Sequence, residues 1–127
     1  YYLADRDQGT IRAFYRHQVH NDVFAWPGLQ DITASVDFTA MAEAGTGAGF
    51  KLADYTNKAS FLLGNGIDQA LLQAEELTDE VGRVALREQL KRLTLPSEMG
   101  ERFGVIGFQR DVDFEPAFAL GDLTWRL

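Results

Sequence analysis

Only two segments of the sequence have the clear pattern of sheet strands, and this small number constrains the fold more than any other feature. Residues 50–56 alternate between apolar and polar side chains, and residues 102–109 form a mainly apolar run. Helical patterns fill the sequence between them. Because two strands do not make a stable sheet in water, we expect the sheet to be completed by another domain, another subunit or an exchanged element.

The composition is typical of one globular domain and argues against two classes of partner. The 127 residues include 46% hydrophobic side chains, which is enough for one core. Nineteen acidic and twelve basic residues give a net charge of −7, which disfavours nucleic-acid binding, because the one basic cluster is small. That cluster consists of Arg12, Arg16, His17 and His20. No apolar run approaches the roughly 20 residues that span a membrane, and no signal peptide is visible.

Cysteine is absent from the sequence, which excludes disulfides, thiolate metal sites and a cysteine nucleophile. This absence suits a reducing compartment such as the cytoplasm. Two histidines and an acid, His17, His20 and Asp22, have ligand types that suit zinc or iron. Such a small group in a predicted loop is a weak metal signal, so we predict no metal site.

Four segments have helical periodicity, and local signals mark where they begin or end. The predicted helices are residues 38–48, 58–63, 67–76 and 78–93. Asp37, Asn57 and Thr78 are placed as N-caps, and Pro96 ends the last helix. That helix carries the apolar residues Val81, Val84, Leu86, Leu90 and Leu93.

The remaining segments are less regular. Residues 1–10 read as a loop, residues 10–19 favour an extended segment, and residues 20–28 form a loop with Phe24 and Trp26 as expected anchors. The tail, residues 111–127, is acidic and then aromatic. We expect it to be partly ordered and to dock through Leu120, Leu123 and Trp125.

Residues 27–38 combine a turn, a strand-like alternation and a helix cap within a short stretch. Ile32, Ala34 and Val36 point to one side of the alternating run, and polar side chains point to the other. Many α/β proteins build the edge of a site in this way. Asp31 and Asp37 could form a carboxylate pair, although capping alone explains Asp37. No glycine-rich phosphate loop precedes a helix.

Several motifs occur in one order and together resemble a known family. They are residues 9–17 (GTIRAFYRH), 27–38 (PGLQDITASVDF), 61–63 (FLL) with Gly66 and Ile67, and 95–101 (LPSEMGE) leading into Phe103, Val105 and Ile106. This pattern is similar to that of the MidA-like S-adenosylmethionine-dependent methyltransferases, whose mitochondrial members are arginine methyltransferases that assist respiratory complex I assembly. The resemblance covers nearly everything from Gly9 to about Arg110.

The resemblance implies an α/β fold in which this chain is the C-terminal part, roughly the last third, of a Rossmann-like class I methyltransferase domain. Residues 50–56 and 102–109 would form the antiparallel hairpin at the edge of the sheet, with residues 57–93 as a helical insertion. The tail over residues 111–127 matches no pattern of the family. Ser35 stands where the family usually has histidine, and Lys58 where it usually has glutamine.

The resemblance implies the function of a protein methyltransferase with S-adenosylmethionine as its cofactor, and the mitochondrial members of the family suggest arginine as the methyl acceptor. The family's cofactor loop lies upstream of the matched residues, so we expect the isolated chain to be inactive and to bind no cofactor. The compartment would be the cytoplasm in a bacterial-type protein or the mitochondrial matrix in a eukaryotic one.

Substrate-side candidates lie at the loop and strand edge: Thr10, Arg12, His17, Asp31, Thr33 and Asp37. Asp31 would be the partner of a substrate guanidinium, because a carboxylate accepts its fork of donors. Each of these residues has a structural alternative as a turn, cap or surface ion-pair residue. The alternative function is a non-catalytic interaction or assembly module that docks a partner protein on the acidic helices of residues 67–93, and homodimerisation or strand exchange would complete the sheet.

Overall fold

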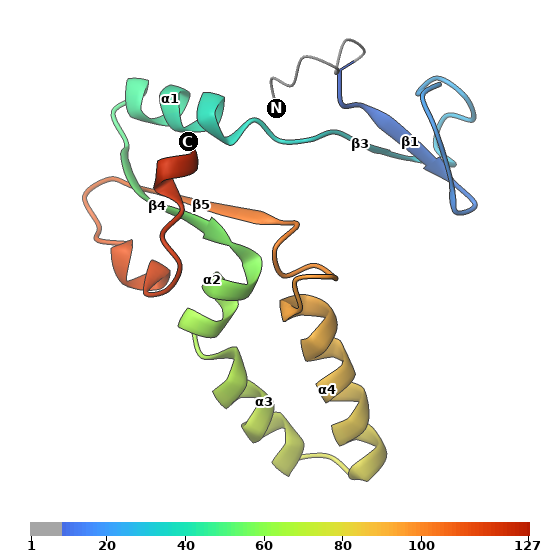
Figure 1. The fold of residues 1–127 in the computed structure, drawn as a ribbon, viewed down its shortest axis with the longest axis vertical. Helices are drawn as coiled ribbons and strands as arrows, with labels where there is room; N and C mark the ends of the chain where they lie inside the picture. Colours follow the sequence, from blue (N-terminus) through green and yellow to red (C-terminus); the bar gives the residue numbers. More distant parts are fainter. Residues whose placement is uncertain (1–8) are drawn as a thin grey trace. The chain divides into compact units, whose positions relative to one another are not determined.

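The structure of this chain is a computed structural model that describes residues 9–127. The chain divides at Asp37 into an N-terminal unit and a C-terminal unit, and Figure 1 shows the elements of each. The loop predicted over residues 1–10 lies almost entirely outside the described residues. Among the described residues, no helix has the length and apolar character needed to cross a bilayer.

The N-terminal unit is a three-stranded antiparallel sheet. Its strands are β1 (Arg12–Tyr15), β2 (Gln18–His20) and β3 (Asp31–Thr33), in the order β2-β1-β3. The extended segment predicted over residues 10–19 is therefore a hairpin. Its two central turn residues, Arg16 and His17, have φ of 47° and 64°, as a type I′ turn requires. Because that turn usually has Asn-Gly, the sequence carried no turn signal.

The predicted anchors of the loop after β2 differ in what they do. The ring of Trp26 lies 4.7 Å from that of Tyr15 and 5.7 Å from that of His20, so Trp26 packs on the hairpin. Phe24 was wrongly predicted as an anchor, because its side chain is 86% exposed. Its backbone N–H donates to the Asp22 carboxylate at 3.1 Å, and this local turn leaves the ring in solvent.

The strand-like alternation of residues 27–38 is shorter in the structure than the sequence suggests. Only residues 31–33 pair as a strand. Ile32 and Val36 are 57% and 54% exposed, so the apolar side of the run has no buried partner within the described residues.

The C-terminal unit contains the predicted helices and strands, with bounds within two residues of those expected. They are α1 (Phe38–Gly47), β4 (Lys51–Asn57), α2 (Lys58–Gly64), α3 (Ile67–Glu76), α4 (Glu80–Thr94) and β5 (Gly104–Gln109), followed by the short 3-10 helices η1 (Glu115–Phe118) and η2 (Thr124–Arg126). β4 and β5 pair antiparallel, as expected for the hairpin strands, with an irregularity between Leu52 and Asp54.

Helix α1 covers one face of the β4–β5 pair. The ring of Phe38 at the start of α1 lies 4.8 Å from that of Tyr55 in β4. Farther along α1, Gly45 faces Phe108 of β5 so closely that a side chain at position 45 would overlap the Phe108 ring. The absence of a side chain at Gly45 therefore lets the helix lie against the strand.

The tail covers the other face. Phe118 of η1 is only 7% exposed and lies over Gly107 of β5, where any side chain would meet its ring. The hydroxyl of Thr56, which is fully buried in β4, donates to the carbonyl oxygen of Gly121 at 2.5 Å. The backbone N–H of Leu123 donates to the carbonyl oxygen of Tyr55 at 2.8 Å. These contacts order the tail along β4.

One of the three predicted tail contacts is wrong: Trp125 is 78% exposed, so it is not the anchor. Leu120 docks as predicted, because it lies against Gly64 of α2 and its carbonyl accepts the Thr56 hydroxyl at 3.3 Å, but its side chain is 49% exposed and is not the anchor either. Phe118 takes that role because the glycine beneath it leaves room for a ring. Leu123, the third predicted contact, docks through its backbone as well as its half-buried side chain.

The helices between β4 and β5 form an extension of the unit. The Asn57 side chain accepts the Ser60 N–H at 2.8 Å and caps α2 as predicted. Asp79, and not Thr78, caps α4 by accepting the Gly82 N–H at 2.9 Å. The Thr78 side chain packs instead beside Gly82. In Figure 1, α3 and α4 lie side by side and extend away from the β4–β5 pair.

Half-buried Asp54 sits at the irregular position of β4, close to Asp122 of the tail. Burial is the main cause that raises the pKa of the Asp54 carboxyl, and the charge of Asp122 adds to it. Hydrogen bonds from Thr124 lower the pKa of Asp122. Burial and the neighbouring Asp122 therefore both disfavour the ionised form of Asp54 in the folded chain.

The first prediction concerns the tail. Phe118→Ala should lower the free energy of unfolding by about 3 kcal/mol, because it removes a buried ring and leaves a cavity over Gly107. Trp125→Ala should change that free energy by less than about 0.5 kcal/mol, because its ring is exposed. Urea unfolding followed by circular dichroism measures both. A loss from Trp125→Ala as large as that from Phe118→Ala would contradict the assignment of Phe118 as the anchor.

A second prediction concerns the Asp54–Asp122 pair. A raised pKa means that the folded state binds the proton more tightly, so ionised Asp54 destabilises the fold above its folded pKa. Asp54→Asn keeps the acceptor for the Tyr55 N–H and should raise the urea midpoint at about pH 7. The gain should shrink as the pH falls towards 3.8, the ordinary pKa of the group.

Asp113→Asn is the matched control, because Asp113 is exposed and its oxygen accepts a backbone N–H that an asparagine would also accept. A gain from Asp54→Asn that is the same at both pH values would contradict the assignment.

Candidate functional site

The register of the N-terminal sheet brings three of the predicted site residues to one face. Arg12 lies directly opposite Thr33, and Phe14 lies directly opposite Asp31. Opposite residues share a face, and so do residues two apart on one strand. Arg12, Asp31 and Thr33 therefore project from the same side of β1 and β3. The Arg12 guanidinium donates to the Ile11 carbonyl at 2.8 Å, and within residues 9–127 it forms no ion pair with Asp31.

The other three predicted residues occupy different places. Thr10 accepts the backbone N–H of Ser35 at 3.1 Å through its hydroxyl oxygen, which ties the start of the sheet to the segment after β3. His17 lies in the β1–β2 turn, at the opposite end of β1 from Thr10. Asp37 directly precedes α1, where an N-cap belongs. The structure therefore does not gather all six residues into one cluster.

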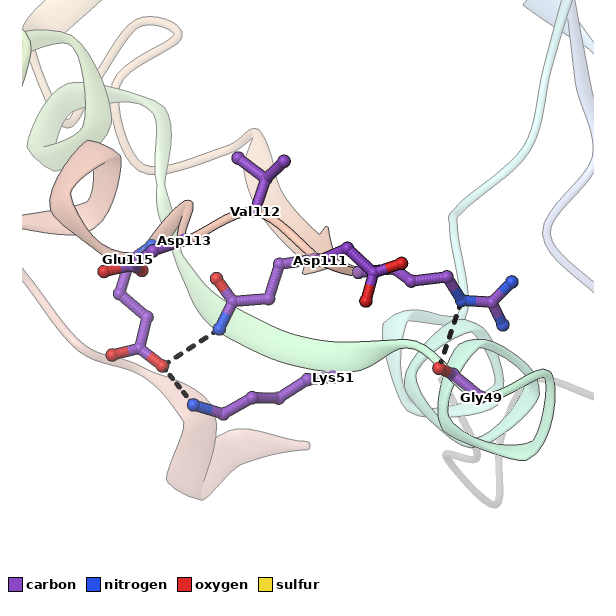
Figure 2. Close-up of a pocket in the computed structure, with 8 residues that line it drawn as sticks. Gly49, Lys51, Asp111, Val112, Asp113 and Glu115 are labelled. Atoms are coloured by element: carbon purple, nitrogen blue, oxygen red, sulfur yellow. Dashed lines mark hydrogen bonds and ion pairs between the residues drawn. The ribbon is translucent and has the colours of Figure 1, made fainter.

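Two pockets lie at opposite ends of the β4–β5 pair. The first, of about 460 Å³, is shown in Figure 2. It is lined by Gly49, Lys51, Gln109, Arg110, Asp111, Val112, Asp113 and Glu115.

Most charged groups of the first pocket already have partners. Lys51 forms an ion pair with Glu115 at 2.5 Å, and the Gln109 amide donates to the same carboxylate at 3.0 Å (Figure 2). The hydrogen bond from Lys51 lowers the pKa of Glu115. Arg110 donates to the carbonyl of Gly49 at 3.4 Å and to that of Ala48, just after α1. These groups join the tail and α1 to the strand ends, which is a structural role.

The second pocket, of about 450 Å³, lies where β4 ends and β5 begins. It is lined by Phe38, Tyr55, Thr56, Asn57, Glu101, Arg102, Phe103, Gly104, Leu123 and Arg126. In open α/β sheets, ligands bind beyond the carboxyl ends of the strands, and this pocket is at the carboxyl end of β4. Within the described chain, neither Arg102 nor Arg126 forms an ion pair. We therefore take the second pocket as the candidate site of the C-terminal unit.

Sequence reasoning missed this pocket because its residues come from separate segments. Tyr55 belongs to β4, Arg102 precedes β5, and Arg126 lies in η2. Only strand pairing and tail docking bring them together. The one available signal was that Arg102 begins the segment predicted as a strand, residues 102–109, of which only Gly104–Gln109 pairs.

The comparison with known sequences agrees with the motifs. A family model described as "Putative S-adenosyl-L-methionine-dependent methyltransferase" matches residues 1–56. The chain is 40% identical over 98 residues to protein arginine methyltransferase NDUFAF7, mitochondrial, of Rattus norvegicus, covering 74% of this chain and 21% of the relative. Its Homo sapiens counterpart is 36% identical over 98 residues, with the same shares. The chain thus spans about a fifth of the length of these curated relatives.

Solved structures give a match over the whole chain. Two crystal structures of a superfamily protein from Burkholderia thailandensis, one native and one bound to S-adenosyl-homocysteine, each match with a TM-score of 0.85 and 44% identity. The match covers 100% of this chain and 34% and 33% of those chains. The predicted α/β fold class and the predicted family are confirmed. The chain belongs, over the part that it spans, to the MidA-like family of S-adenosylmethionine-dependent methyltransferases.

Proposed function

We propose that this chain is the C-terminal part of a protein arginine methyltransferase and contributes a substrate-side wall and a helical insertion. The observation that carries the proposal is the whole-chain match, at 44% identity, to a structure bound to S-adenosyl-homocysteine. The choice of arginine rests on the curated relatives, which are named protein arginine methyltransferases. The protein would work in the bacterial cytoplasm or, in a eukaryote, in the mitochondrial matrix.

The residues described here do not fit the cofactor. S-adenosylmethionine supplies the methyl group when it is bound, and folds of this class hold it with a glycine-rich turn between a strand and a helix N-terminus. In this chain Gly45, Gly47 and Gly49 lie at the end of α1 and before β4, which is the wrong order. The proposal therefore places the cofactor loop in a preceding segment of the whole protein.

The shared face of β1 and β3 is the proposed wall for the substrate. Asp31 is exposed there, and a carboxylate accepts two parallel donors from a guanidinium. Holding the guanidinium in this way orients the nitrogen that receives the methyl group and gives its proton a nearby acceptor. Arg12 and Thr33, next to Asp31 on the same face, would limit how the substrate backbone approaches.

The sheet supports the view that more protein belongs to this fold. Within residues 9–127, β5 pairs only with β4, while the tail follows the other edge of β4 through Leu123. The sequence of β5, Gly-Val-Ile-Gly-Phe-Gln, contains no charge or proline that would discourage further pairing. The proposal is that a strand of the preceding segment pairs with the open edge of β5.

The third prediction tests the methyltransferase proposal. A longer protein that contains this chain should bind S-adenosylmethionine in isothermal titration calorimetry and methylate arginine in a protein substrate, as seen by mass spectrometry. The chain alone should show no binding heat. In the longer protein, Asp31→Asn should lower kcat/KM by about 10–100-fold, because an amide does not hold the guanidinium charge.

Asp113→Asn, on the exposed tail, is the control and should leave kcat/KM unchanged. If the longer protein shows no cofactor binding, the enzyme proposal fails. If it is active but Asp31→Asn behaves like the control, the proposed wall is wrong.

A second candidate function is that α4 docks a second copy of this chain. Val81 and Val84 are 78% and 52% exposed on the outer side of α4, away from the side that packs on α3. The first turn of α4 is acidic at Glu80, and its last turn is basic at Lys91 and Arg92. Two copies of α4 packed antiparallel through their first halves would bury Val81 and Val84 against each other.

The fourth prediction is a concentration-dependent dimer in sedimentation-velocity experiments. Val84→Glu should weaken the dimer by at least about tenfold, because it buries a carboxylate in the contact. Leu72→Glu is the matched control, since Leu72 is 63% exposed on α3 and outside that contact. A chain that remains monomeric at about 0.1 mM would rule out this docking.

A further inference from the structure

We propose that the pocket at the carboxyl end of β4 binds an oxyanion, either a carboxylate or a phosphate group, and that Arg102 and Arg126 hold it. The names of the relatives assign no role to this pocket. The proposal concerns this chain alone, so it does not depend on the presence of a cofactor or on the methyltransferase proposal.

The backbone on each side of the pocket is fixed by hydrogen bonds. The carbonyl of Phe103, next to Arg102, accepts the Lys58 N–H at 2.8 Å. The N–H of Arg126 donates to the carbonyl of Leu123 at 2.9 Å, and Leu123 is itself bound to β4. Both arginines therefore line one pocket of about 450 Å³ from ordered backbone, and the Arg126 guanidinium also lies 5.6 Å from the centre of the exposed Trp125 ring. A site held in this way loses little entropy when it binds a ligand.

Arg102 and Arg126 are two of several cations that form no ion pair within the described residues, and they are the two arginines that line this pocket. Four other cations have carboxylate partners: Lys51, Arg83, Arg87 and Lys91. The Arg110 guanidinium donates hydrogen bonds to backbone carbonyls just after α1. In a chain with a net charge of −7, the lining of this pocket is net positive, because it holds two arginines without an ion pair in the described residues and one acid, Glu101.

The donors of the pocket suit an oxyanion. A guanidinium presents parallel N–H groups that match the oxygens of a carboxylate or a phosphate. Asn57 uses its side-chain oxygen to cap α2, so its NH₂ group is the part left to donate. Glu101 also lines the pocket, and its negative charge repels an anion. Neutralising Glu101 should therefore strengthen anion binding, which provides a second test of the proposal.

The fifth prediction uses the ¹⁵N-labelled chain and nuclear magnetic resonance at constant ionic strength. Sodium phosphate, sodium acetate and a short acidic peptide are titrated separately. At least one of these three ligands should cause saturable changes in the amide chemical shifts of Asn57, Phe103 and Gly104, with a dissociation constant of about 1–10 mM. Tighter phosphate binding would identify a phosphoryl ligand, and tighter binding of acetate or the acidic peptide a carboxylate ligand.

Variants separate the pocket from general charge effects. The double variant R102Q/R126Q should weaken binding at least about tenfold, which corresponds to loss of one charge-assisted hydrogen bond. Glu101→Gln should strengthen it. Arg92→Gln on exposed α4 removes the same charge outside the pocket and should have no effect.

Unfolding curves identical to those of the unmodified chain show that the double variant is folded. Should it unfold, the single variants R102Q and R126Q take its place, each expected to weaken binding at least about threefold. Shifts that do not saturate, or that are equal in R92Q and R102Q/R126Q, would overturn the proposal.

Discussion

The pairing of β4 with β5 is the constraint on which the C-terminal unit depends. Two strands expose both faces of their sheet, and each face has to be covered before the pairing is stable. Alternate residues of each strand face opposite sides of the sheet: Tyr55 and Phe108 face α1, while Thr56 and Gly107 face the tail. Two segments that are far apart in the sequence thus form the two covering layers, and the loss of either would expose one side of the same small sheet.

Much of this arrangement was predictable, because the signals for it are local. Asn57 before α2 and Pro96 after α4 mark helix ends through the chemistry of one or two residues, and these bounds were close to those observed. Tertiary features were not predictable in this way. Phe118 and Trp125 are both aromatic residues of an irregular tail, and only the glycine at position 107 of a distant strand decides which of them is buried.

The candidate sites show the same division. Register places Arg12 and Asp31 on one face of the N-terminal sheet. Both were predicted as site residues only through the family resemblance, because no local signal predicted that their strands pair. The tight turn between β1 and β2 could not be predicted from the sequence, because Arg16 and His17 adopt positive φ without the glycine that usually marks such a turn. The pocket with Arg102 was missed for a third reason: its walls exist only after the strands have paired and the tail has docked.

The two ends of the β4–β5 pair also differ in what their charges do. At the amino end of β4, Lys51 and Glu115 satisfy each other, and this neutral pairing joins the tail to the sheet. At the carboxyl end, the tail is held by backbone hydrogen bonds through Leu123, which need no charged side chain. The fold is secured there without an ion pair of Arg102 or Arg126 within the described residues, and the Arg126 guanidinium lies against the Trp125 ring, 5.6 Å from its centre. Positive charge that stability does not require is the physical reason to look for a ligand at this end.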